Sequence, residues 1–142
     1  ALPILRLTGR LTTPYLTALP GGGQTRFQPI WIGDLAPMMA DAVDDPSYRG
    51  EIYEIGGPEK LTLADITKLI HRAGGRPVVV FPVPMSLARL ALVLTDPVPL
   101  VPFGLDQYRY LGIDNTVAHN DVDAFGRSAA DLRTLSAYLK GK

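Results

Sequence analysis

Glycine and proline, 14 and 13 of the 142 residues, divide the chain into short segments. They gather at three breaks, Leu19-Pro20-Gly21-Gly22-Gly23, Gly56-Gly57-Pro58 and Gly74-Gly75. Clusters of this kind favour turns and end both helices and strands. The apolar runs between the breaks are therefore short, and a large uninterrupted sheet is excluded for this stretch of sequence.

Three runs have the β-branched and aromatic character of strands, namely residues 26–32, 51–55 and 77–82. Pro29 lies inside the first run, which suggests an edge strand or an irregular start. Apolar residues at helical spacing predict one helix after Asp34 and one that starts near Leu63. The same spacing predicts further helices over residues 2–12, 84–94, 105–111 and 129–140. Residues 84–94 are apolar enough to predict a buried helix, and residues 96–102 predict a proline-rich loop.

Local capping residues place the helix ends. Asp34 predicts the N-cap of one helix, which the sequence Asp44-Asp45-Pro46 then ends. Thr62 and Asp65 have capping-box spacing before a helix that starts near Leu63 and stops at Gly74-Gly75. Ser128 predicts the N-cap of the last helix.

Three short strands make a poor sheet by themselves, because a stable sheet needs more strands or a covering helix layer. We therefore expect an α/β chain that forms one domain over residues 1–142 and lacks a larger sheet upstream. The sequence begins at Ala1, and its first residues lack the charged segment and apolar core that a signal peptide has. We therefore expect the chain to be part of a longer protein. Helix faces left without that sheet predict a homodimer of the fragment.

Composition excludes several classes of function. Lys and Arg balance Asp and Glu at 14 each, which argues against nucleic acid, whose binding depends on phosphate neutralisation. There is no cysteine for thiolate catalysis, and His71 and His119 lack the spacing of metal ligands. The apolar region 78–105 is broken by Arg89, Asp96 and several prolines, so it suits a membrane surface or a partner better than a membrane span.

Few residues point to catalysis. Gly56-Gly57 stands between a strand and a helix, as phosphate-binding glycines do, but Pro58 lacks an N–H donor. We expect a turn there that needs a positive φ. Tyr138 and Lys142 have Tyr-x-x-x-Lys spacing, which we attribute to chance at a frayed helix end, and His119 lies in a polar loop. Trp31 fits either a core position or the wall of a ligand pocket.

Four segments in this order resemble a known family: Gly21-Gly22-Gly23, residues 26–36 (RFQPIWIGDLA), residues 53–59 (YEIGGPE) and residues 61–66 (LTLADI). Residues 104–117 and 123–139 continue the likeness. The set resembles the C-terminal half of extended or atypical short-chain dehydrogenase/reductases. The nearest members are nucleoside-diphosphate-sugar epimerase-like proteins and the nucleotide-binding accessory subunit of respiratory complex I.

The resemblance implies the C-terminal portion of an NAD(P)-binding Rossmann-type fold. The dinucleotide loop and the catalytic Tyr and Lys of the family lie in the N-terminal half, which is absent here. The resemblance assigns no catalytic or cofactor-binding residue to this chain, and it assigns substrate binding to Arg26, Gln28 and Trp31. Phe27 and Trp31 replace the arginine and histidine that epimerases usually carry in this strand. This difference weakens the prediction of a sugar-nucleotide substrate.

Two functions follow from the resemblance. One is the substrate lobe of an NAD(P)-dependent reductase or epimerase, which binds NAD or NADP only together with its N-terminal half. The other is a non-catalytic module of a respiratory NADH dehydrogenase that acts in assembly or stability. Expected partners are the N-terminal half, a small-molecule substrate and a membrane complex, and the expected location is cytoplasmic and peripheral to the membrane.

Overall fold

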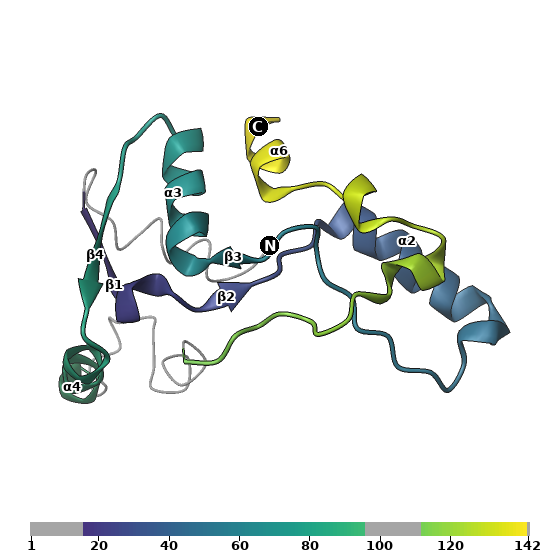
Figure 1. Cartoon of the computed structure of the whole chain (residues 1–142), viewed down its shortest axis with the longest axis horizontal. Coiled ribbons are helices and arrows are strands. Elements are labelled where there is room, and N and C mark those ends of the chain that lie inside the picture. Colours follow the sequence, from purple (N-terminus) through teal and green to yellow (C-terminus); the bar gives the residue numbers. More distant parts are fainter. Residues whose placement is uncertain (1–15, 96–111, 142) are drawn as a thin grey trace. The chain divides into compact units, whose positions relative to one another are not determined.

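The computed structural model describes residues 16–95 and 112–141 (Figure 1). Helices and short strands alternate, and the main strand pair is parallel, which confirms the predicted α/β class. The chain divides into two compact units. Unit 1 comprises Ala1–Arg26 and Thr62–Asp114, and unit 2 comprises Phe27–Leu61 and Asn115–Lys142. The helices predicted over residues 2–12 and 105–111 and the loop at 96–102 lie outside the described residues.

Unit 1 contains the parallel pair. Strand β1 (Leu16–Pro20) pairs with β4 (Val79–Val83), in a register that sets Leu16 opposite Val79. The prediction over residues 77–82 is confirmed in β4, whereas β1 was not predicted. Helix α3 (Leu63–Ala73) precedes β4, and α4 (Met85–Thr95) follows it.

The two faces of the parallel pair differ in exposure. In β1 the side chains of Thr17 and Leu19 are buried, whereas Leu16 and Ala18 are exposed. Leu19 lies close to Gly23, and Gly23 also approaches the backbone of Ala64 in the first turn of α3. The buried face of β1 therefore meets the start of α3.

Helix α3 begins and ends as its sequence predicts. Thr62 Oγ1 accepts a hydrogen bond from the N–H of Asp65 at 3.1 Å, and the Asp65 carboxylate accepts from the N–H of Thr62 at 3.3 Å. This is the expected capping box. At the other end Gly74 donates to the carbonyl of Ile70, and Gly75 has a φ of 67° that L-residues rarely adopt.

Unit 2 has its own small core. Helix α2 (Ile32–Asp44) is followed by the 3₁₀ turn η2 (Pro46–Tyr48), and the C-terminal segment contributes η3 (Asp121–Phe125), η4 (Ala129–Asp131) and α6 (Leu135–Lys140). The buried side chains are Met38, Val122 and Leu132. Partly buried residues pack around them, namely Ile30, Ile55, Phe125 and Ala129.

Two predicted strands differ from the structure. Only Arg26–Phe27 of the run 26–32 forms a strand, β2, which pairs with the two-residue strand β3 (Leu61–Thr62) where the chain passes between the units. The run 51–55 forms no strand. Its backbone groups are instead bonded partly to side chains of residues 120 and 121, which take the place of a neighbouring strand.

Two helix predictions are corrected in part. Helix α2 begins at Ile32, because the carbonyl of Trp31 already accepts bonds from the N–H groups of Asp34 and Leu35. Asp34 therefore lies in the first turn and is not the N-cap. The region 129–140 is broken into η4, capped by Ser128, and α6, capped by Thr134.

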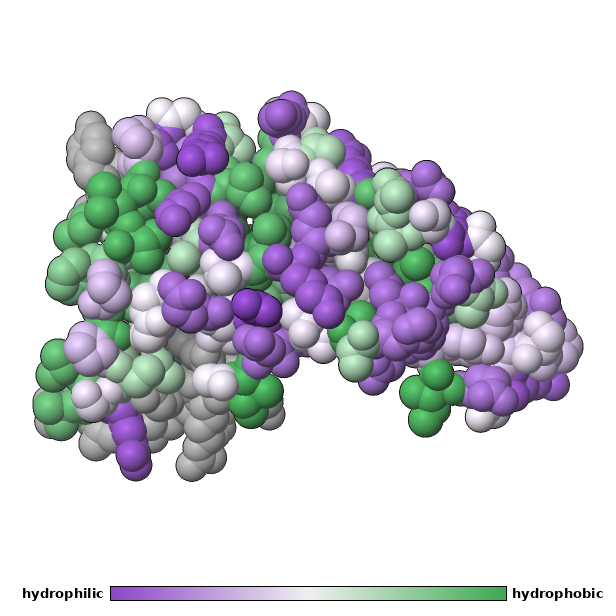
Figure 2. Space-filling model, viewed as in Figure 1, coloured by the Kyte–Doolittle hydropathy of each residue, from purple (hydrophilic) through white to green (hydrophobic). Residues whose placement is uncertain are grey.

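Helix α4 was predicted to be buried, but its Leu87 and Leu90 are 56% and 55% exposed. Strand β4 has exposed apolar side chains as well, and Figure 2 shows green, hydrophobic surface over the part of unit 1 that contains it. None of the helices in the described part of the chain is long and apolar enough to cross a membrane.

Candidate functional site

Trp31 forms the centre of a small cation–aromatic cluster in unit 2, which we call the Trp31 cluster: Trp31, Arg133 and Tyr138. The Arg133 guanidinium carbon lies 4.8 Å from the centroid of the Trp31 ring and 5.6 Å from that of Tyr138. The indole ring also lies directly against Gly33, since a Cβ at that position would come within 2.6 Å of it. Gly33 thus lets the ring fold back over the start of α2.

The backbone fixes Arg133 at this place. Its N–H donates to Asp34 Oδ2 at 2.8 Å, which joins the segment between η4 and α6 to the first turn of α2. The guanidinium itself forms no ion pair with a carboxylate among residues 16–95 and 112–141. A planar cation that lies near two rings and pairs with no carboxylate of the described residues is suited to bind an anionic group.

Gln28 is used to hold the backbone together. Its Nε2 donates to the carbonyl of Gly57 at 2.9 Å, and its Oε1 accepts from the N–H of Val117 at 3.2 Å. Its own backbone bonds to Asn115 and Gly57 as well. The two side-chain bonds hold the Gln28 amide in one orientation against the Gly57 segment.

Gly56 and Gly57 are required for a different reason from the predicted one. Neither has a positive φ, so the predicted left-handed turn is wrong. A Cβ at Gly57 would instead collide with the carbonyl of Pro29, and a Cβ at Gly56 would lie 2.5 Å from the side-chain amide carbon of Gln28. Two chain segments approach so closely here that no side chain fits between them.

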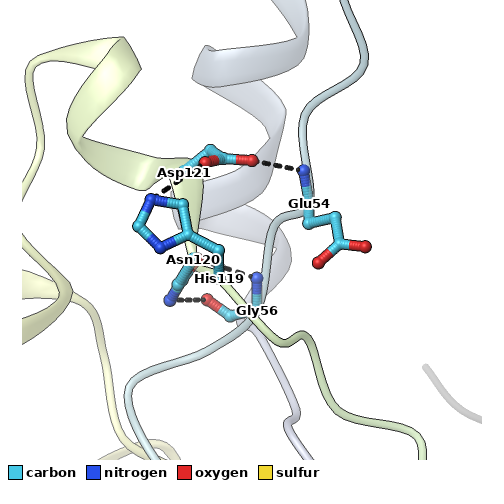
Figure 3. A network of polar contacts seen from close by, with 5 residues as sticks. All are labelled: Glu54, Gly56, His119, Asn120 and Asp121. Carbon is cyan, nitrogen blue, oxygen red and sulfur yellow. Dashed lines mark hydrogen bonds and ion pairs between the residues drawn. The ribbon is translucent and has the colours of Figure 1, made fainter.

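Asn120 and Asp121 tie the same segment to the C-terminal part of unit 2 (Figure 3). Asn120 Oδ1 accepts from the N–H of Gly56, and Asn120 Nδ2 donates to the carbonyl of Gly56, both at 3.0 Å. Asp121 Oδ2 accepts from the N–H of Glu54 at 2.8 Å, and the N–H of Asp121 donates to the carbonyl of Glu54 at 2.9 Å. These paired bonds explain why the segment is ordered without a strand.

The His119 side chain is 81% exposed, and its Nε2 lies 3.4 Å from Asp121 Oδ1 (Figure 3). This agrees with the prediction of a polar loop. No group of three or more His, Cys, Asp or Glu residues that could hold a metal ion occurs within the described ranges.

The geometry does not suit a dinucleotide pyrophosphate at either glycine cluster. The N–H groups of Gly56 and Gly57 already donate to Asn120 and to Gln28, so a phosphate would find no free donor there. The start of α3, which Gly23 approaches, carries the Asp65 carboxylate, and the N–H of Leu63 donates to Thr25. An anion would meet a negative charge at that helix end.

Among the described residues of unit 2, the pKa values of Tyr53 and Asp45 are shifted. Partial desolvation, followed by the charge of Glu51, raises the pKa of Tyr53, which makes it a poorer proton donor and keeps it from acting as a phenolate. Hydrogen bonds from Ser47 lower the pKa of Asp45, where the carboxylate caps η2 at 2.8 Å as predicted for a turn residue.

The three predicted substrate residues are divided between the units. Gln28 and Trp31 lie in unit 2, whereas Arg26 lies in unit 1, where its N–H donates to Asp114 Oδ1 at 2.8 Å. Sequence reasoning missed Arg133. Its position opposite Trp31 is set by the long-range bond to Asp34, and only the tendency of Arg to stack on Trp could have drawn attention to it. Lys142, the second residue of the Tyr138 and Lys142 pair, lies outside the described residues.

Comparison with known proteins finds similarity both by sequence and by structure. The chain is 36% identical over 112 residues to the mitochondrial NADH dehydrogenase (ubiquinone) 1 alpha subcomplex subunit 9 of Arabidopsis thaliana, a match that covers 72% of this chain and 28% of the relative. No family model matches the chain.

A nucleoside-diphosphate-sugar epimerase from Staphylococcus aureus has a similar structure, with a TM-score of 0.60 and 18% sequence identity. That match covers 96% of this chain and 46% of the epimerase, so the chain spans less than half of either protein. The two matches confirm the predicted resemblance to the epimerase-like short-chain dehydrogenase/reductases and to the NADH dehydrogenase subunit, and the structural match confirms the partial Rossmann-type fold.

Proposed function

We propose that this relative of an NADH dehydrogenase subunit, with part of an epimerase fold, is the substrate-side lobe of a larger NAD(P)-dependent reductase or epimerase. In this proposal a dinucleotide-binding half supplies NAD or NADP and the catalytic residues. The lobe supplies contacts to the substrate and has no turnover by itself.

The observation that carries the proposal is the incomplete sheet of unit 1. Parallel strands occur almost only in sheets whose two faces are both covered. Within the residues that the structure describes, the β1–β4 sheet has two strands, and its outer face leaves Leu16, Val79 and Phe81 at 50%, 64% and 55% exposure. Such a pair fits the margin of a larger parallel sheet, which the uncovered part of the epimerase-like fold would provide.

The substrate end of the lobe is proposed to lie at the Trp31 cluster. The guanidinium of Arg133 favours a substrate with a carboxylate or phosphate, and the Trp31 and Tyr138 rings favour a flat or apolar neighbouring group. Arg26 stays a proposed contact from unit 1, whereas we now assign Gln28 to positioning the Gly57 segment.

The test compares the isolated chain with the complete protein that contains it. NADH and NADPH are titrated into each, and the emission of Trp31, which is the only tryptophan of the chain, is followed. The proposal expects that NADH or NADPH binds the complete protein with micromolar affinity but does not bind the chain alone at such concentrations. It also expects that Arg133→Gln raises the KM of the complete protein for its substrate. Binding of the cofactor by the isolated chain would contradict it.

A second candidate function is a non-catalytic module of a respiratory NADH dehydrogenase, and the 36% identity to a subunit of that enzyme favours it. It predicts that the complete protein co-migrates with the membrane NADH dehydrogenase on native gels and that its loss lowers the amount of assembled enzyme. Normal assembly of the enzyme after deletion, together with turnover by the purified protein, would reject the non-catalytic module and support the reductase or epimerase. The two candidates place the protein in the cytoplasm and at the membrane periphery respectively.

A further inference from the structure

Helix α6 is short and adds nothing to the buried core of unit 2. It has six residues, none of them buried, and its Leu135 and Leu139 are half-buried. The core side chains Met38, Val122 and Leu132 all lie outside it. Isolated helices shorter than about 12 residues are marginal in water. Helix α6 therefore depends on contacts with other parts of the chain.

The Arg133 side chain supplies contacts at the C-terminal end of α6. Its guanidinium carbon lies 5.6 Å from the centroid of the Tyr138 ring. Its Nη2 lies over Gly141, the C-cap of α6, since a Cβ there would come within 2.8 Å of this nitrogen. A cation is favoured at this end of a helix, where the helix dipole is negative. Arg133 thus stabilises α6 both through its charge and through a ring.

The same side chain joins α6 to the start of α2. The guanidinium carbon lies 4.8 Å from the centroid of the ring of Trp31, which is the N-cap residue of α2. The Arg133 N–H donates to Asp34 Oδ2 at 2.8 Å, so the backbone from which the side chain extends is fixed to the first turn of α2. The Trp31 ring therefore holds the guanidinium where it meets Tyr138 and Gly141.

We propose that α6 is a strap that opens and closes independently of the core of unit 2, and that the Trp31 cluster holds it closed. Elements without buried side chains belong to the parts of a protein that open at the lowest free energy. The Asp34 bond keeps the Arg133 backbone in place, so the chain opens from Thr134, the N-cap of α6, onward. Opening removes Tyr138 from the guanidinium and takes the cluster apart.

The strap has a consequence for substrate binding, and this consequence rests on the proposed function. The closed state is the one that brings the guanidinium and both rings together. An anionic substrate with a flat neighbouring group therefore binds the closed state more tightly than the open state. A ligand shifts an equilibrium by its difference in affinity for the two states, so this substrate closes the strap.

Hydrogen exchange of the full chain, followed by NMR, tests the strap without a ligand. The N–H of Tyr138 donates to the carbonyl of Thr134 at 3.0 Å and reports the opening of α6. The N–H of Gly56 donates to Asn120 in the same unit and is the reference. Arg133→Gln should speed exchange at Tyr138 about threefold or more, the factor expected for loss of an exposed cation–π contact, and leave Gly56 unchanged.

Trp31→Leu distinguishes a strap held by α2 from a helix that is stabilised by Arg133 alone. This variant keeps Arg133 and Tyr138 and removes only the ring on the α2 side. We expect faster exchange at Tyr138, by about threefold. The double variant with Arg133→Gln should exchange no faster than Arg133→Gln alone, because both changes break one shared contact.

A matched control and two contrary results complete the test. Arg127→Gln removes an arginine of unit 2 that contacts no aromatic ring in the described segments, and it should leave both amides unchanged. Unaltered exchange at Tyr138 in Trp31→Leu would overturn the proposal, because α6 would then be held without α2. Equal acceleration at Gly56 and Tyr138 in every variant would overturn it too, because α6 would then open only with the whole unit.

Phenyl phosphate, which joins a flat ring to an anionic group, tests the consequence for the substrate. At millimolar concentration it should slow exchange at Tyr138 in the unaltered chain and have no effect in Arg133→Gln. Absence of slowing, with the expected responses to Arg133→Gln and Trp31→Leu, would support the strap and reject the anionic substrate of the proposed function. The two proposals can therefore fail separately.

Discussion

The carbonyl oxygen of Pro29 occupies the space that a side chain at Gly57 would need. The N–H of Gly57 also donates to the carbonyl of Gln28, and its carbonyl accepts from the Gln28 side chain. The two segments of unit 2 are therefore locked together at a single residue. Their separation is too small even for the methyl group of alanine.

Gly57→Ala is expected to destabilise the chain by about 2 kcal/mol or more, because forcing atoms into a filled site costs roughly 1–3 kcal/mol or occasionally more. Urea unfolding followed by circular dichroism measures the change. Gly74→Ala is the matched control, since its φ is −82° and an added Cβ would have no neighbour closer than 3.6 Å. Equal stability of the two variants would show that the segments can separate at no cost.

Asn120→Asp tests the pair of hydrogen bonds between the Asn120 side chain and the Gly56 backbone. The change keeps the acceptor for the N–H of Gly56 but replaces the Nδ2 donor by a second oxygen that faces the Gly56 carbonyl. We expect a loss of about 1–3 kcal/mol at pH 7, the cost of an unsatisfied and repelled polar group. The deficit should shrink as the pH falls and the introduced carboxyl gains a proton that it can donate.

Asn115→Asp serves as the comparison, because Asn115 is exposed and its side chain has no bond in the described part of the chain. It adds the same charge to the same unit. A pH-independent deficit in Asn120→Asp, equal to that of Asn115→Asp, would contradict the role assigned to the Nδ2 donor.

The capping box of α3 predicts a dependence of stability on acid. The hydrogen bond from the Thr62 hydroxyl, at 2.6 Å, is the main cause that lowers the pKa of Asp65 below its usual value of 3.8. A lowered folded-state pKa stabilises the fold above the unfolded-state value, and this stabilisation is lost as the pH falls through the folded-state pKa. Asp65 is mostly exposed, so the effect is small, about 0.5 kcal/mol.

Asp65→Asn should therefore unfold at a lower urea concentration than the unaltered chain at pH 7, and the difference should begin to shrink near pH 4 and close only below the lowered folded-state pKa, where the carboxylate is protonated in both states. Urea titrations at pH 7, 5 and 3 measure it. A difference that stays constant over this range would mean that the carboxylate charge does not contribute.

Arg133→Gln tests the Trp31 cluster without any ligand. Loss of the guanidinium removes a cation–π contact worth about 0.5–1 kcal/mol and opens one face of the Trp31 ring to water. The emission maximum should shift to longer wavelength. Arg127→Gln provides the control, since Arg127 has no contact with an aromatic ring in the described segments, and its spectrum should equal that of the unaltered chain.

Local signals predicted the local structure well. The Thr62 and Asp65 pair, the Gly74-Gly75 stop and the end of α2 at Asp44 depend on residues within one or two helical turns, and all were confirmed. The strand β1 was missed because its sequence, LTALP, runs into the glycine break and pairs only with the distant β4.

The site was less predictable, because its contacts join residues far apart in the sequence. Gly57 is needed for the approach of Pro29, and Arg133 is placed by Asp34, so neither role has a local sequence signal. Trp31 was predicted as a substrate contact, and this role stays a prediction.

Each compact unit is built from two separate stretches of the chain, and this governs the order in which the protein can fold during synthesis. Unit 2 begins at Phe27, is interrupted by Thr62–Asp114 and is completed only by Asn115–Lys142. A ribosome must therefore finish translating the whole of that intervening segment before Met38 can meet Val122 and Leu132. Closing so long a loop is slow compared with forming helices. The apolar side of α2 consequently stays uncovered in the growing chain until its final segment emerges.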